Sequence, residues 1–128
     1  MFHFLREIAV RIMFDLRRCQ RPTDSSLNAI GGTIEGDQYS IPSTMAELVL
    51  REAGWNAVSL GTSLPFSSLA RAITDIRPKI FWLSVSYIQP SIDFIQEFAK
   101  LSKACMDTGA ALVVGGRALT ENLRQRMT

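Results

Sequence analysis

The sequence predicts an α/β protein built on an open parallel sheet that carries helices on both faces. Short apolar runs of strand length alternate along the chain with longer segments whose apolar residues recur at helical spacing. The run at residues 80–85 is apolar almost without interruption, as expected for a central parallel strand that is buried on both faces. Strands that alternate with helices are joined by right-handed crossovers, which set the strands parallel. We therefore expect a three-layer, Rossmann-like or flavodoxin-like sandwich.

Composition indicates a single soluble globular domain. The chain has 128 residues, of which 47% are hydrophobic and 20% are charged. No run approaches the ~18 consecutive apolar residues that a membrane span needs, so we expect no membrane contact. The two cysteines, Cys19 and Cys105, lie far apart and belong to no paired motif. Reduced thiols in a cytoplasmic protein are the simplest interpretation.

The first 22 residues are predicted to form an amphipathic helix, followed by a turn and a domain at 26–128. The apolar stripe of this helix would contain Leu5, Ile8, Ile12 and Leu16. Residues 1–22 hold five arginines against two acids, a balance of +3, so the rest of the chain sums to −1. A nearly neutral domain does not bind nucleic acid by charge. We interpret the helix as the end of an upstream helical or DNA-binding region, and expect DNA contact only through residues outside this chain.

Four strands are expected, at residues 27–32, 56–60, 80–85 and 110–114. The family of folds usually has a fifth strand, and none is visible before the chain stops at Thr128. That strand is either absent or lies beyond the end of this sequence; without it the fourth strand would be an open edge that favours a homodimer.

Helices are expected between these strands. The first, at about 39–53, would end before Gly54 and turn its apolar residues toward the core. The second would start at Pro65 and end before Pro78. The third follows Pro90, and a short basic helix closes the chain. The predicted core-facing residues are Ile41, Met45, Leu48 and Val49 in the first helix, and Ile92, Ile95, Phe98, Ala99, Ser102 and Cys105 in the third.

Small and polar residues follow three of the strands. They are Gly36-Asp37, Ser84-Val-Ser86 and Gly115-Gly116. The carboxyl ends of strands in an open α/β sheet converge on the ligand crevice at the topological switch point. Glycine lets the backbone approach a ligand closely, and serine hydroxyls both donate and accept hydrogen bonds. The pattern fits a large, flat ligand with polar edges, although glycine and serine also suit ordinary tight turns.

These motifs resemble the cobalamin-binding domain family, and in particular its sensor branch attached to MerR-type transcription regulators. That family has Asp-x-His-x-x-Gly after the first strand, Ser-x-Leu after the third and Gly-Gly after the fourth. This chain has Asp37-Gln-Tyr39-Ser-Ile-Pro42, then Ser84-Val-Ser86, then Gly115-Gly116. The resemblance spans residues 32–116.

The resemblance implies a corrinoid whose lower nucleotide tail enters the core beside the sheet, with cobalt above the strand ends. The family's histidine binds cobalt, and its aspartate orients that histidine. Here Asp37 keeps its position, but Tyr39 stands where the histidine would be, Pro42 replaces glycine and Ser86 replaces leucine. A neutral phenol is a poor cobalt ligand, so we predict no metal ligand from the protein. The predicted cofactor-binding residues are Gly36, Asp37, Tyr39, Ser40, Ser84, Ser86, Gly115 and Gly116.

We interpret the chain as a cobalamin-binding-type sensory domain of a transcriptional regulator, without a histidine ligand to cobalt. One alternative is a degenerate domain with no cofactor that serves dimerisation or interaction. Another is the corrinoid carrier domain of a methyltransferase or mutase. Haem and flavin remain alternative ligands for the same crevice. No nucleophile–base pair is visible, and the only histidine, His3, lies near a chain end, so we expect no enzymatic activity.

Overall fold

The computed structural model describes residues 28–127. The helix predicted at 1–22, with His3 and Cys19, lies outside the described residues. Strands and helices alternate as the sequence predicts, and no helix within 28–127 is long and apolar enough to cross a membrane. The elements are β1 (Asn28–Thr33), α2 (Ile41–Glu52), β2 (Asn56–Ser59), α3 (Phe66–Ile76), β3 (Ile80–Ser84), α4 (Phe94–Thr108), β4 (Ala111–Gly115) and α5 (Glu121–Met127).

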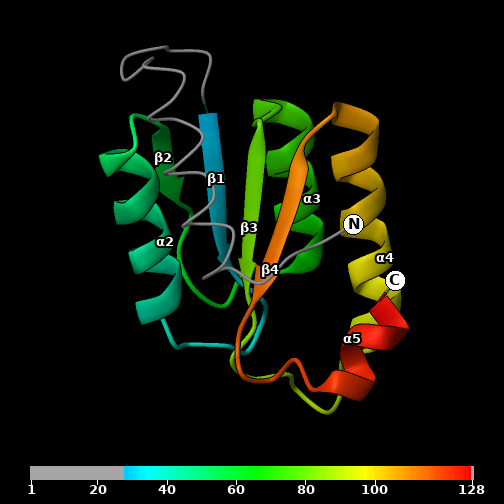
Figure 1. The fold of residues 1–128 in the computed structure, drawn as a ribbon. Coiled ribbons are helices and arrows are strands. Elements are labelled where there is room, and N and C mark those ends of the chain that lie inside the picture. Colours follow the sequence, from blue (N-terminus) through cyan, green and yellow to red (C-terminus); the bar gives the residue numbers. More distant parts are fainter. Residues whose placement is uncertain (1–27, 128) are drawn as a thin grey trace.

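The strands form one parallel sheet in the order β2-β1-β3-β4 (Figure 1), which confirms the predicted fold class. Within the described residues the sheet has four strands, with β2 and β4 at its edges. From β1 the chain crosses outward to β2, and from β3 it crosses outward in the other direction to β4. The topological switch point therefore lies between the carboxyl ends of β1 and β3, where α/β proteins of this kind bind ligands.

Helices cover both faces of the sheet (Figure 1), and a separate apolar cluster fills each side. α3 and α4 pack on one face, where Phe66, Phe94 and Phe98 form consecutive aromatic contacts. Cys105 of α4 belongs to this cluster, and burial raises the pKa of its thiol to about 11. The thiol therefore stays protonated near neutral pH and acts as a small core residue.

The face of α2 that packs on the sheet differs from the prediction. Ser43, Ala46 and Leu50 are buried, whereas Ile41, Met45 and Leu48 are each more than half exposed. The helix has two stripes at helical spacing, and the one with smaller side chains faces the sheet. The reason is Trp82 of β3, which lies beneath α2 and donates its indole N–H to Ser43, so that the stripe of Ser43, Ala46 and Leu50 faces the sheet.

The core face of α4 is also shifted from the prediction. Phe98 and Cys105 are buried as expected, but the remaining buried positions are Phe94 and Leu101 rather than Ile95 and Ser102. The helix begins at Phe94 because the Asp93 side chain accepts a hydrogen bond from the backbone N–H of Gln96 and so caps it. Both helices keep their predicted places, and what changes is their rotation about their own axes.

Gly31 is the position in β1 that makes room for Trp82. The two residues are paired in register, and a Cβ atom at Gly31 would overlap the indole ring. We predict that Gly31→Ala lowers the free energy of unfolding by about 1–3 kcal/mol, as overpacking of a dense core does. In a Trp82→Leu background the same substitution should cost less, because the overlapping ring is gone. Urea denaturation of the unmodified protein, the two single variants and the double variant measures the coupling energy between Gly31 and Trp82. If Gly31→Ala lowers the free energy of unfolding equally in both backgrounds, this packing is contradicted.

Candidate functional site

Asp37 connects the two loops that flank the switch point. Its carboxylate is buried, with the residue only 1% exposed. One oxygen accepts a hydrogen bond from the backbone N–H of Tyr39 in its own loop, at 3.0 Å. The other accepts from the backbone N–H groups of Ser86 and Tyr87 in the loop after β3, at 2.6 and 3.3 Å. The β1–α2 loop and the β3–α4 loop are therefore held together by one side chain.

The same turn is fixed on its other side by the loop that follows β2. The Thr33 hydroxyl donates to the Asp37 carbonyl at 2.6 Å and accepts from the Ser63 N–H at 2.8 Å. The Ser63 hydroxyl in turn accepts from the Gly36 N–H at 3.0 Å. Gly36 has φ +91°, and a Cβ there would overlap the side chain of Gln89. Glycine is thus required in this turn by both backbone conformation and space.

The role of Asp37 differs from the one that the resemblance implies. Its carboxylate bonds to backbone N–H groups, and no hydrogen bond to the side chain of Tyr39 is among its contacts. Tyr39 is 44% exposed, and the guanidinium of Arg117 lies 5.6 Å from the centre of its ring. This cation–π contact places the phenol at the rim of the carboxyl edge, beside the turn after β4.

A row of small residues crosses the sheet at the carboxyl end of the strands. Thr33, Ser84 and Gly115 are paired in register on neighbouring strands. All three are buried, and the Ser84 hydroxyl has no hydrogen-bond partner. Buried polar groups without a partner are rare in folded proteins and call for an explanation such as a ligand. Among the predicted site residues, Ser84 therefore has a buried hydroxyl that is free to form a hydrogen bond with a ligand.

The other predicted site residues lie around this row. Gly116 has φ +135°, and a Cβ there would overlap the backbone of Val85 at the end of β3. Ser86 is partly buried and contributes its backbone N–H to Asp37. Ser40 is exposed at the start of α2, and its side chain makes no capping bond. Seven of the eight positions thus surround the switch point, whereas Ser40 stands at its margin.

Trp82 is a site residue that the sequence analysis treated only as core. It lies two residues before Ser84, so both side chains point to the α2 face of the sheet. The indole N–H donates to the Ser43 hydroxyl at 3.0 Å, and Ser43 lies 3.2 Å from the Ser59 hydroxyl. The alternation of side chains along β3 could have indicated the shared face, but the register that sets Gly31 beside the indole could not be read from the sequence.

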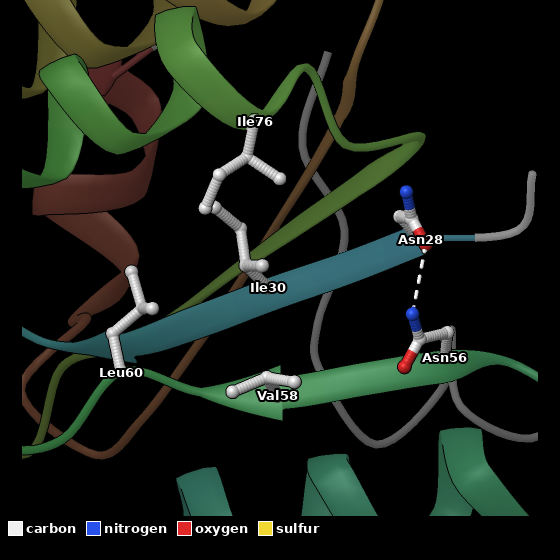
Figure 2. Close-up of a pocket in the computed structure, with 6 residues that line it drawn as sticks. All are labelled: Asn28, Ile30, Asn56, Val58, Leu60 and Ile76. Atoms are coloured by element: carbon white, nitrogen blue, oxygen red, sulfur yellow. Dashed lines mark hydrogen bonds between the residues drawn. The ribbon is translucent and has the colours of Figure 1, made fainter.

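A groove on the α3 face is separate from this site. It has a volume of about 210 Å³ and runs beside β1 and β2 (Figure 2). Asn56 donates to Asn28 at 3.1 Å at one end. The lining residues are Asn28, Ile30, Asn56, Val58, Leu60 and Ile76. None of the predicted site residues lines this groove. Within residues 28–127, no three His, Cys, Asp or Glu side chains are grouped so that they could hold a metal ion.

The curated proteins whose sequences are similar to this chain include proteins named as corrinoid proteins. Trimethylamine corrinoid protein 1 of Methanosarcina acetivorans is 26% identical to this chain over 108 residues, which cover 84% of the chain and 50% of the relative. The chain thus spans about half the length of the curated relatives it matches. No protein-family model matches the chain.

Comparison with solved structures gives the same fold. A cobalamin-binding protein from Desulfitobacterium hafniense has a TM-score of 0.60 at 22% identity, over 78% of this chain and 49% of that one. The methanol:cobalamin methyltransferase complex of Methanosarcina barkeri has a TM-score of 0.61 at 18% identity, over 80% and 39%. At these identities the structures establish the fold alone. Together with the curated relatives, they support the resemblance to the cobalamin-binding domain family.

Removing the charge of Asp37 should loosen both loops. We predict that Asp37→Asn lowers the free energy of unfolding by about 1–3 kcal/mol without any cofactor present, because an amide presents N–H₂ to at least one of the three backbone donors. The matched control is Asp93→Asn, at an exposed helix cap where asparagine serves as well as aspartate. Equal urea midpoints for Asp37→Asn and the unmodified protein would show that the carboxylate does not hold the loops together.

Proposed function

We propose that this chain is the corrinoid-binding part of a carrier protein that serves a methyltransferase system. The observation that carries the proposal is the unpartnered, buried hydroxyl of Ser84 at the switch point. The curated relatives are named as corrinoid proteins, and one of the structures with the same fold is a methyltransferase complex. These names favour a carrier over the sensory domain that the sequence analysis placed first.

The residues at the carboxyl edge fit a corrinoid in part. The row of Thr33, Ser84 and Gly115 carries no large side chain, and a corrin has amide groups around its rim that a serine hydroxyl can bind. The turn containing Gly36 and the Gly116 backbone would approach the ring closely. Tyr39 and Tyr87 stand at the exposed rim, about half exposed each, and would contact the ligand with their rings.

The fit does not include a lower ligand from the protein. Tyr39 takes the position of the family's histidine, and its ring is already engaged by Arg117. A bound corrinoid would supply the cobalt centre that carries the methyl group. The residues of this chain would bind and orient the ring and shield one of its faces from water. The methyltransferase that uses the group would be a separate partner, a proposal supported by the methyltransferase complex among the structures with the same fold.

Corrinoid binding can be measured directly on the purified chain. We expect the protein to retain a corrinoid through gel filtration, seen as visible absorbance that co-elutes with the protein. Ser84→Ala should weaken binding of cobinamide about tenfold, the value of one hydrogen bond to a buried hydroxyl. The same substitution should leave the apo protein at least as stable, because it removes an unpartnered polar group.

Ser68→Ala, on the exposed side of α3, is the matched control and should change neither quantity. If neither cobalamin nor cobinamide is retained, the chain does not act as a corrinoid carrier. The degenerate interaction domain would then be the better interpretation.

Restoring histidine tests the position of Tyr39. We expect Tyr39→His to shift the visible absorbance of the bound corrinoid, because imidazole nitrogen is a far better cobalt ligand than a neutral phenol. Met106→His, at an exposed position near the end of α4 and away from the loops at the carboxyl edge, is the control and should leave the spectrum unchanged. An unchanged spectrum for Tyr39→His, with corrinoid still bound, would show that position 39 does not face cobalt.

A further inference from the structure

The two faces of the sheet differ in what they offer a ligand at the carboxyl edge. On the face of α3 and α4, the ends of the strands carry Leu83 and Val85, which pack with Phe66 and Phe94 in the apolar core. On the α2 face, the same level of the sheet carries only Thr33, Ser84 and Gly115, which we call the Ser84 row. A ligand group that enters the core from the carboxyl edge can therefore do so only on the α2 face.

The next row down on that face is closed. It consists of Ser59, Gly31, Trp82 and Val113, again paired in register; the Ser59 hydroxyl lies 3.2 Å from that of Ser43 in α2, and the indole of Trp82 is fully buried. The indole ring lies against Gly31, and its N–H donates a hydrogen bond to the Ser43 hydroxyl of α2. The ring is thus fixed by contacts to both the sheet and the helix, and it fills the space between them.

The spacing of the rows determines how deeply a ligand group can enter on the α2 face. Successive residues on one face of a strand are ~7 Å apart, so only about that distance separates Ser84 from the level of Trp82. A short polar side chain of a corrin ring is about as long as the spacing of one such row. A nucleotide, with its phosphate, ribose and base, is longer than that and would meet the indole.

We propose that Trp82 limits the depth of the site, so that the chain selects corrinoids that lack the lower nucleotide. The inference rests on the proposed function, since it concerns the form of corrinoid that the Ser84 row accepts. The inference also agrees with the replacement of the family's histidine. In this chain Tyr39 stands where the family's cobalt ligand would be, and Trp82 fills the space that would receive the displaced base.

The test compares two corrinoids on the full 128-residue chain. Cobalamin carries the lower nucleotide, and dicyanocobinamide has the same corrin ring without it. We expect the unmodified protein to bind cobinamide at least about tenfold more tightly than cobalamin, measured by equilibrium dialysis with absorbance detection. This comparison needs no variant, so it does not depend on how well a substituted core folds.

Shortening the tryptophan should remove the selection. In Trp82→Val we expect the affinity for cobalamin to rise about tenfold while the affinity for cobinamide changes less than about threefold. Trp82→Leu gives a smaller opening and should give an intermediate ratio. Trp55→Val is the matched control, because Trp55 packs against the same apolar cluster but precedes β2 at the amino edge of the sheet.

The outcomes separate this inference from the proposed function. Binding of cobalamin as tight as that of cobinamide would overturn the selection by Trp82 and leave the carrier function standing. A Trp82→Val protein that is folded by circular dichroism but keeps the original preference would do the same. Failure of both corrinoids to bind the unmodified protein would overturn both proposals together.

Discussion

One buried carboxylate organises the carboxyl edge of this protein. Asp37 lies in the turn after β1, yet two of its three hydrogen bonds go to the loop after β3. A buried charge is stable only where hydrogen bonds replace water, so the loops must stay close for the aspartate to remain buried. The switch point between β1 and β3 is therefore closed at its base by the polypeptide itself. Both rim tyrosines, Tyr39 and Tyr87, take their backbone positions from this contact.

A second constraint acts one layer deeper, between Trp82 and α2. The indole needs a glycine beside it in β1 and a small residue above it in the helix, and Gly31 and Ser43 provide both. Its hydrogen bond to Ser43 then fixes the rotation of α2. The apolar residues on its other side, Ile41, Met45 and Leu48, are turned outward as a consequence. One large side chain thus determines both the depth of the α2 face and the surface of the helix that covers it.

These two constraints bear differently on function. The Asp37 contact holds together the two loops at the switch point, where the Ser84 hydroxyl is left without a partner. The Trp82 contact instead fills space on the face where a ligand would enter. A corrinoid held by its ring alone is compatible with both. The proposed carrier function rests on the first constraint, and the proposed choice of corrinoid rests on the second.

The sequence by itself determined the order of the elements, the parallel sheet and the loops at its carboxyl edge, because these depend on local periodicity and turn residues. It also placed the polar residues Asp37 and Ser84 at the carboxyl ends of the first and third strands, where the structure buries both. It could not show that Asp37 bonds to the backbone of a loop 49 residues away, nor which of two apolar stripes of α2 faces the sheet. Those features depend on the pairing register of strands and on the volume of side chains packed across it. Only the tertiary structure, which sets Gly31 beside Trp82, decided them.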